Sequence, residues 1–432
     1  MRSNKSCKTC PNRLHVGIAI LFPLLLSAFC FCHFLMLPPA IALLIMPYAP
    51  VRRVLRLWEA TIAAYWLSFG AWLLENLGGV KLIISGDTFT KKDNVLIICN
   101  HRTRLDWMWL WSWAAYFDVL SSYRVILKDS LRCFPWWGWG MSLCLFPFIR
   151  RGQKHRSTDL AHLKRNCRYL IQLKVSNSLI IFPEGTDLSP SNQERDRNYA
   201  LSRNLSAYRY VLHPRTGAFL TCLEILRPHV DAVIDLTIGY VDYEPGERPS
   251  EISLLLGRLP REIHVNLKRW DLVLTPLLCR DNIEDAKKFL QLSFDRKEAL
   301  LTSFYNRGKL RFDLDAVGST SSRSSSETSP DPISQLNAPR SGYGDDDALA
   351  NERSQSRYQR LLRKGLVVAV AAVTTVVLMA YVLPTVFFWG YIVATCLLCI
   401  LVTVSCEGFD SLELNLPVRG GDIRVRRLHK EH

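Results

Sequence analysis

The chain has 432 residues, enough for two or three compact units with a sizeable apolar core. Apolar residues make up 49% and charged residues 22%, a balance that excludes both an intrinsically disordered chain and a pure bundle of membrane helices. Lysine and arginine total 54 against 39 acidic residues, so the formal net charge is +15. This excess suits a nucleic acid, an anionic membrane surface or a polyphosphate ligand, and composition alone does not choose among them.

The first apolar segment, residues 14–47, predicts a membrane span behind a short basic tail at residues 1–13. Only His15 and His33 interrupt its apolar sequence, and neither need be charged. About 20 helical residues cross the hydrocarbon core of a bilayer, so one span fits, and the Pro38–Pro39 pair is expected to break the remainder. A secretory signal peptide is the alternative, but its apolar region would be only about 7–15 residues long.

Residues 365–406 form a second apolar segment, which has about 40 uncharged residues with Pro384 and Gly390 near its middle. This length predicts two spans joined by a tight bend. Basic residues precede and follow the segment: Arg357, Arg360, Arg363 and Lys364 before it, and Arg419, Arg424, Arg426, Arg427 and Lys430 in the tail at residues 407–432. A hairpin places both clusters on one face of the membrane, which the positive-inside rule makes cytosolic. The sequence therefore predicts an integral, multi-pass membrane protein.

The region between the membrane segments predicts a folded domain. Residues 51–78 have an amphipathic pattern rich in Trp and Leu, which predicts a helix that lies in the membrane interface or braces the first span. Across residues 81–310, short apolar runs alternate with stretches of helical length, which indicates an α/β layer architecture. The expected strands cover residues 95–99, 123–127, 143–149, 179–182, 233–241, 252–256 and 262–267, and the expected helices cover residues 104–116, 157–175 and 283–305. Residues 315–355 are rich in Ser, Asp and Pro and predict a disordered linker.

The segment Asn100-His101-Arg102-Thr103-Arg104-Leu105-Asp106 follows the buried strand expected at residues 95–99. On one ideal helix, His101 and Asp106 would point about 140° apart, but across a strand-to-helix turn they can meet. The carboxylate would then accept one imidazole N–H and leave the other nitrogen free as a base that deprotonates a hydroxyl. The alternative is a surface histidine near a helix start, where the helix dipole favours an acidic residue.

A second polar segment, Phe182-Pro183-Glu184-Gly185-Thr186, begins at the end of the strand expected at residues 179–182. A glycine at a strand end permits close approach of the backbone to a ligand. The carboxylate of Glu184, the amide of Gly185 and the hydroxyl of Thr186 can position a polar headgroup or a developing oxyanion. The alternative is an ordinary strand-to-loop turn.

Together, the H-x4-D and F-P-E-G-T motifs, in this order and between membrane segments, resemble the glycerolipid acyltransferase family of the 1-acylglycerol-3-phosphate type. Four longer segments are similar to its lysocardiolipin acyltransferase 1 branch: residues 100–108, 182–188, 211–217 and 260–265. The similarity spans roughly residues 50–310, and the C-terminal hairpin fits the same layout. The resemblance implies an α/β acyltransferase domain, a mixed sheet flanked by helices, with N-terminal and C-terminal transmembrane helices in the endoplasmic reticulum membrane.

The resemblance also implies a reaction. Members of the family transfer a fatty acyl group from acyl-CoA, a co-substrate rather than a cofactor, to the hydroxyl of a lysophospholipid or of a glycerol phosphate. In this branch the acceptors are precursors of anionic phospholipids, such as lysophosphatidylinositol, lysophosphatidylglycerol and lysocardiolipin. A histidine is the general base, an aspartate orients it, and an E-G-T segment helps to bind the acceptor's phosphate. The resemblance assigns these roles to His101, to Asp106, and to Glu184 with Gly185 and Thr186.

Two departures from the family pattern bear on the acceptor. Many relatives that act on glycerol phosphates carry Arg after E-G-T, whereas this chain has Asp187, whose carboxylate would repel a phosphate monoester. Arg151, in a segment of the family type F-I-x-R, and Arg215 are then the expected phosphate ligands, because guanidinium binds phosphate oxygens in a bidentate fork. The family's Pro-containing fourth motif is absent from residues 235–240. Acylation of lysophosphatidic acid to phosphatidic acid is the alternative reaction.

Other patterns bear on the remaining classes of function. No G-x-S-x-G segment is present, which argues against a serine lipase. Cys7-x-x-Cys10 has no second pair at ligand spacing, so no metal site is expected. The basic residues lie mostly beside the membrane segments, so their charge is expected to meet the anionic bilayer and the phosphates of acyl-CoA, and not a nucleic acid. The resemblance adds a lysophospholipid to the expected partners. A non-catalytic lipid-binding protein is the alternative from another class, and it requires His101 and Asp106 to be inert.

Overall fold

The computed structural model describes residues 13–46, 48–174, 177–241, 250–279, 281–306 and 345–416, with side chains from residue 355 in the last range. The N-terminal tail with Cys7 and Cys10 lies outside the described residues, as do residues 315–344 of the expected linker. Residues 345–355 of the expected linker are helical instead of disordered. They begin a helix at Asp345 that continues into the first C-terminal span.

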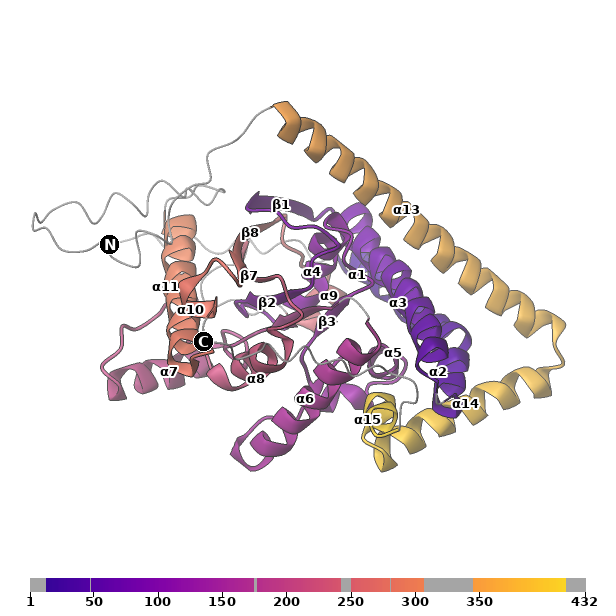
Figure 1. The fold of residues 1–432 in the computed structure, drawn as a ribbon. Helices are drawn as coiled ribbons and strands as arrows, with labels where there is room; N and C mark the ends of the chain where they lie inside the picture. Colours follow the sequence, from indigo (N-terminus) through magenta and orange to yellow (C-terminus); the bar gives the residue numbers. More distant parts are fainter. Residues whose placement is uncertain are drawn as a thin grey trace, which may run out of the picture.

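A six-stranded mixed sheet forms the centre of the domain (Figure 1). Its strands are β1 (Lys81–Gly86), β2 (Val95–Cys99), β3 (Tyr123–Val125), β6 (Ser178–Ile181), β7 (Ala232–Tyr240) and β8 (Glu262–Asp271), in the spatial order β1-β8-β7-β2-β6-β3. Strands β7, β2, β6 and β3 run parallel, and β8 is antiparallel to β7. A separate pair joins β4 (Leu127–Lys128) to β5 (Phe148–Ile149). The predicted α/β domain with a mixed sheet is confirmed.

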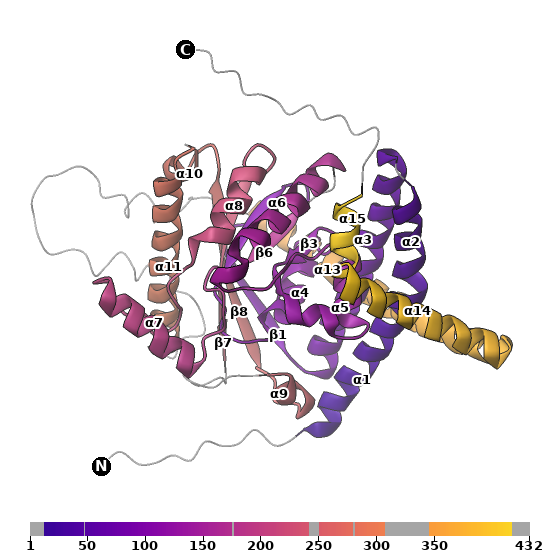
Figure 2. The ribbon, with the colours of Figure 1, turned by 90° about the horizontal axis from the view of Figure 1, so that it is seen from below.

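Helices cover both faces of this sheet, which explains why its central strands are continuous apolar runs. Alternate residues of β2 point to opposite faces, and all five are buried. One face packs against α4 (Asp106–Tyr116) and the N-terminal helices, and the other packs against α6 (Arg156–Gln172), α8 (Thr216–Leu226) and α11 (Ile283–Asn306). Figure 2 shows the N-terminal helices on one side of the molecule and α7 (Pro190–Ser202) with α11 on the other.

The N-terminal apolar segment is one continuous helix and not the broken one that its proline pair predicts. It comprises α1 (Leu14–Cys30), a π-helical turn at Phe31–Met36 and α2 (Leu37–Ile45). The π turn lies just before Pro38–Pro39, where a wider turn accommodates the missing N–H and the ring of a proline. The amphipathic helix expected at residues 51–78 is α3 (Ala49–Trp72), extended by a second π turn at Leu73–Leu77.

Three helices of the described residues are long and apolar enough to cross a membrane: Leu14–Ile45, Gln355–Val382 and Thr385–Ser405. The last two belong to α13 (Asp345–Val382) and α14 (Thr385–Ser405), which meet at Pro384. In Figure 1 this bend lies well away from the sheet, and the two helices diverge from it in a wide V. This arrangement agrees with two C-terminal spans, although they do not pack side by side along their lengths.

The beginning of the expected basic tail is instead a buried helix, α15 (Gly408–Leu414). Its two acidic side chains are almost inaccessible to solvent. Asp410 accepts hydrogen bonds from Arg132 (3.0 Å) and Ser142 (2.6 Å), and Glu413 accepts from Arg56 (3.0 Å). Because α15 directly follows the last candidate span, these buried pairs fasten the end of that span to the sheet domain.

Two expected strands differ in the structure. Residues 252–256 lie mostly in a short helix, α9 (Glu251–Leu255), because Ser250 and Ser253 form a capping box at its start. Of residues 143–149, only Phe148–Ile149 is a strand, because α5 (Trp137–Leu143) ends at the beginning of that range. Helix α7 was not expected, because its exposed sequence has no apolar stripe of helical spacing.

The anchoring of α15 can be tested with two carboxylates that each pair with an arginine. Glu413→Gln should lower the free energy of unfolding by about 3 kcal/mol, because it leaves Arg56 buried with one partner fewer. Glu407→Gln should change it by less than about 1 kcal/mol, because both Glu407 and its partner Arg150 are substantially exposed. Thermal unfolding in detergent, followed by tryptophan fluorescence, measures both. Equal effects would contradict a role of α15 as an anchor.

Candidate active site

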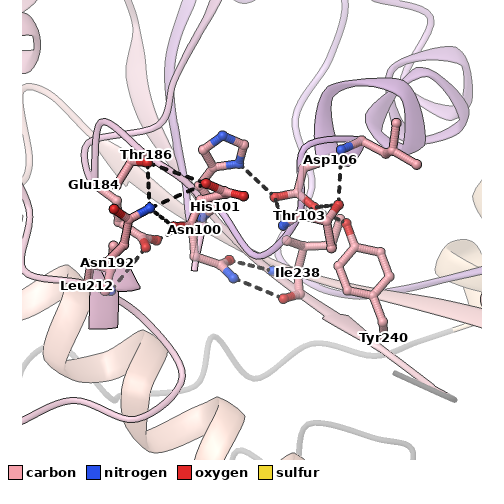
Figure 3. Close-up of polar contacts among 12 residues, drawn as sticks. Asn100, His101, Thr103, Asp106, Glu184, Thr186, Asn192, Leu212, Ile238 and Tyr240 are labelled. Atoms are coloured by element: carbon pink, nitrogen blue, oxygen red, sulfur yellow. Dashed lines mark hydrogen bonds and ion pairs between the residues drawn. The ribbon is translucent and has the colours of Figure 1, made fainter. Parts of the chain in front are cut away.

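The two polar motifs meet at one edge of the sheet because their strands are neighbours. Strands β2 and β6 run parallel, so their carboxyl ends lie at the same edge, where ligands bind in open α/β sheets. His101 follows β2 and Glu184 follows β6. On the other side of β2, the Asn100 amide donates to the Ile238 carbonyl of β7 (3.0 Å) and accepts from the Ile238 N–H (2.8 Å) (Figure 3). The loop that carries His101 is therefore fixed to both neighbouring strands.

His101 and Asp106 form the pair that the sequence predicts. The Nδ1 atom of His101 lies 2.9 Å from Oδ2 of Asp106, which is the first residue of α4. Asp106 is fully buried, whereas 13% of the His101 side chain is exposed. A carboxylate only accepts hydrogen bonds, so Nδ1 carries the proton and Nε2 presents a lone pair. Among the described residues, no group bonds to Nε2, so this atom is available to a substrate hydroxyl.

Other donors hold the Asp106 carboxylate in place. The Thr103 N–H lies 3.0 Å from Oδ2, the Thr103 hydroxyl donates to Oδ1 (2.7 Å), and the Tyr240 hydroxyl donates to Oδ1 (2.5 Å) (Figure 3). Tyr240 is the last residue of β7, so the third strand of the site also contributes to it. These bonds satisfy a buried charge that would otherwise be costly, and they fix the direction in which the carboxylate meets His101.

The Glu184 side chain binds the protein's own backbone. One carboxylate oxygen accepts the N–H of His101 (2.7 Å) and the other accepts the N–H of Leu212 (3.0 Å). Burial raises the pKa of the Glu184 carboxyl well above its usual value, and the two backbone N–H groups oppose that rise. Phe182 of the same motif stacks on the His101 ring, with centroids 4.5 Å apart and planes 25° apart. The motif therefore positions both the backbone and the ring of His101.

A cavity of about 790 Å³ lies next to this pair, and Phe182 and Glu184 are among its lining residues. Gly185 and Thr186 also line it, together with five arginines: Arg151, Arg156, Arg195, Arg203 and Arg215. Gly185 has φ +71°, and a Cβ atom there would lie 3.3 Å from Cδ of Arg215. The structure thus gathers every site residue expected from the sequence at the pair or around one cavity.

Two of the cavity arginines lie close enough to affect each other. Burial, together with the positive charge of Arg215, lowers the pKa of the Arg151 guanidinium, and Asp187 opposes that effect. Asp187 is buried beside α7, where the Asn192 amide donates to its carbonyl oxygen (2.9 Å). A pair of neighbouring guanidinium groups attracts an anion, and Asp187 reduces the positive charge that the anion meets.

A second histidine–aspartate pair lines the same cavity. Nδ1 of His213 lies 2.9 Å from Oδ2 of Asp196, and the His213 N–H donates to the other oxygen of that carboxylate (3.0 Å). This pair ties α7 to the loop that carries Arg215. Sequence reasoning did not single out His213, Tyr240 or Thr103 as site residues. The contact of Tyr240 with Asp106 arises only in the folded sheet, and that of His213 joins a loop to α7, whereas Thr103 lies three residues before Asp106 in the same turn and could have been found from that spacing.

The comparisons with known proteins identify the family of the chain. A protein-family model described as Acyltransferase matches residues 81–240. Lysocardiolipin acyltransferase 1 of Danio rerio is 34% identical over 304 residues, which cover 70% of this chain and 74% of that protein. The chain belongs to the glycerolipid acyltransferase family.

The comparisons also match a second relative and one solved structure. This acyltransferase is 34% identical over 252 residues to lysophosphatidylinositol acyltransferase 10 of Caenorhabditis elegans, covering 56% of this chain and 61% of that protein. The crystal structure of the 1-acyl-sn-glycerophosphate (LPA) acyltransferase PlsC from Thermotoga maritima aligns with 67% of this chain and 98% of its own, at 16% identity and a TM-score of 0.40. The family and the candidate spans identify a membrane enzyme that acylates lysophospholipids.

The Tyr240 hydroxyl should support catalysis in the acyltransferase through Asp106. Tyr240→Phe removes one hydrogen bond to a buried carboxylate, so kcat should fall about tenfold while KM for both substrates changes little. Tyr123→Phe is the matched control, because its buried hydroxyl donates to the Trp107 carbonyl (2.7 Å) and not to Asp106. Steady-state kinetics on purified protein give both values. An unchanged kcat for Tyr240→Phe would refute the role.

Proposed function

We propose that the protein transfers a fatty acyl group from acyl-CoA to the free hydroxyl of an anionic lysophospholipid, during remodelling of phospholipid acyl chains in the endoplasmic reticulum membrane. Lysophosphatidylinositol, lysophosphatidylglycerol and lysocardiolipin are the proposed acceptors. The observation that carries the proposal is the position of His101, whose Nε2 is unbonded within the described residues and which lies next to the arginine-lined cavity. The names of the relatives support this class of acceptor.

The proposed mechanism is direct transfer without an enzyme-bound intermediate. Nε2 of His101 takes the proton of the acceptor hydroxyl while that oxygen attacks the thioester carbonyl carbon. A new C–O bond forms, the C–S bond breaks, and the CoA thiolate leaves and takes up the proton from the imidazolium. The Asp106 carboxylate stabilises the imidazolium that forms in between. No cofactor is needed, because the thioester supplies the activated acyl group.

The charges around the cavity favour a phosphodiester acceptor. Arg151 and Arg215 supply the positive charge for one phosphate, and Asp187 weakens it. A phosphodiester carries one negative charge, whereas the phosphate monoester of lysophosphatidic acid carries between one and two near pH 7, so the carboxylate penalises the monoester more. Acylation of lysophosphatidic acid is therefore the second candidate reaction. A comparison of lysophosphatidic acid with lysophosphatidylinositol as acceptor distinguishes it from the first.

We also propose that the domain faces the cytosol. Helix α15 follows the last candidate span and packs on the sheet domain, so the domain and the C-terminal end of that span share one side of the membrane. The basic clusters that flank the C-terminal spans mark that side as cytosolic. One N-terminal span and two C-terminal spans are consistent with this arrangement.

His101→Ala should leave the protein folded and membrane-bound but reduce acyl transfer more than a hundredfold, because general-base catalysis contributes about 10²–10⁴-fold. Asp106→Asn should be nearly as damaging, because it favours the wrong imidazole tautomer. His264→Asn is the matched control, since His264 is also buried and pairs with a carboxylate, Glu262 (3.2 Å), but lies outside the site. Labelled acyl-CoA and lysophospholipid in microsomes provide the assay. Activity retained by His101→Ala would refute the proposed base.

Asp187→Asn should increase the ratio of kcat/KM for lysophosphatidic acid to that for lysophosphatidylinositol by about fivefold, because it removes one negative charge beside Arg151. The wild-type protein should prefer the phosphodiester acceptor. Glu224→Gln removes a similar charge from the surface of α8, where it pairs with Lys164, and should leave the ratio unchanged. A wild-type preference for lysophosphatidic acid would favour the second candidate instead.

A further inference from the structure

A second cavity, of about 530 Å³, lies on the other side of the segment that carries Asp187. Three arginines (Arg102, Arg197 and Arg209) and three tyrosines (Tyr208, Tyr210 and Tyr305) line it, together with Leu188, Pro190, Gln193 and Ala207. No carboxylate is among these lining residues, whereas Asp159, Glu184 and Asp196 line the first cavity. The wall of the second cavity is therefore cationic and aromatic, and two neighbouring carboxylates bind its residues: Asp295 accepts the Tyr208 hydroxyl, and Glu298 accepts the N–H groups of Arg209 and Tyr210.

Two residues that line the second cavity are neighbours of His101. Arg102, one of its lining residues, follows His101 directly, and the N–H of Leu188, another, donates to the His101 carbonyl (2.9 Å). Phe182 and Glu184, which line the first cavity, contact the same histidine. Neighbours of His101 thus line both cavities, and a direct transfer needs two substrates bound close to the same base.

Helix α7 separates the two cavities. Arg195 lines the first cavity and Arg197 lines the second, although only one residue lies between them. That residue, Asp196, is bonded to His213 (2.9 Å) and holds the helix in this orientation. Arg195 and Arg197 therefore form a matched pair for substitution: they are the same residue type on the same helix, but they line different cavities.

The aromatic wall of the second cavity is held in fixed positions. Tyr210 stacks on Tyr305, with centroids 5.0 Å apart and planes 22° apart, and the Arg209 guanidinium lies 5.2 Å from the centre of the Tyr210 ring. Tyr208 stacks on His213 at 4.2 Å. A wall that combines ordered aromatic rings with guanidinium groups suits a planar base that carries phosphates.

We propose that this second cavity binds the 3′-phosphorylated adenosine diphosphate part of the acyl donor. The inference rests on the proposed function, since it assumes that acyl-CoA is the donor. That part of CoA carries a purine base for the tyrosine wall, and one phosphate monoester and one diphosphate for Arg197 and Arg209. The acceptor's phosphate then belongs to the first cavity, where Arg151 and Arg215 are neighbours.

Kinetics of the matched pair test the assignment. Arg197→Ala and Arg209→Ala should each raise KM for acyl-CoA about tenfold and leave KM for the lysophospholipid within about twofold, because each loses a charge-assisted hydrogen bond to a phosphate. Arg195→Ala should raise KM for the lysophospholipid instead. Lys288→Ala, an exposed change on α11 outside both cavities, should change neither. If Arg197→Ala and Arg209→Ala raised KM only for the lysophospholipid, or changed neither value, the proposal would be overturned.

A binding measurement keeps this inference separate from the proposed function. Adenosine 3′,5′-bisphosphate should bind to the full chain in nanodiscs, and calorimetry should show at least tenfold weaker binding to the Arg197→Ala/Arg209→Ala variant. The bisphosphate should compete with acyl-CoA, whereas inorganic phosphate at the same concentration should not. If the wild type bound the bisphosphate but did not use acyl-CoA, the result would refute the proposed function and still support the nucleotide site. If binding were equal in the wild type and the variant, the nucleotide site would fail whatever the activity.

Discussion

The bond between the buried Asp106 carboxylate and the His101 imidazole is the interaction on which the active site depends. A fully buried carboxylate is costly unless donors surround it, and here the donors come from the turn after β2, from the end of β7 and from His101 itself. Two parts of the chain, the turn after β2 and the end of β7, must therefore be in register before the imidazole is oriented. The order of strands in the sheet meets this requirement, because β2 lies between β6 and β7.

Glu184 provides the second constraint, and it acts on the backbone. Its two oxygens connect the loop after β2 with the loop that precedes α8, so the base and the arginine-bearing wall of the first cavity move as one unit. Thr186 and Gly185 remain on the cavity surface beside it. Glu184 lines the anion-binding cavity, but both of its oxygens accept backbone N–H groups, which offset the negative charge that it brings to the wall.

The sequence allowed most of the sheet and the His101–Asp106 pair to be predicted, because each motif follows a short buried strand, and strand ends that are neighbours bring their loops together. Tyr240 could not be predicted in its role, since its contact with Asp106 depends on the pairing of β7 with β2. The burial of α15 was also missed. Local sequence showed polar residues after a span, whereas their partners Arg56 and Arg132 lie hundreds of residues away.

The ion pairs of α15 with Arg56 and Arg132 connect the C-terminal candidate spans to the domain that carries the active site. Arg132 binds Asp410, and Arg150, next to the cavity residue Arg151, pairs with Glu407 at the start of α15. The buried Arg132–Asp410 pair therefore fastens the end of the last candidate span to the sheet domain, whereas the Arg150–Glu407 pair is exposed and contributes little. An acceptor that remains in the bilayer can reach a site only if that site is held at a fixed height above the membrane. Buried ion pairs, which specify one arrangement more strongly than they add stability, suit that purpose.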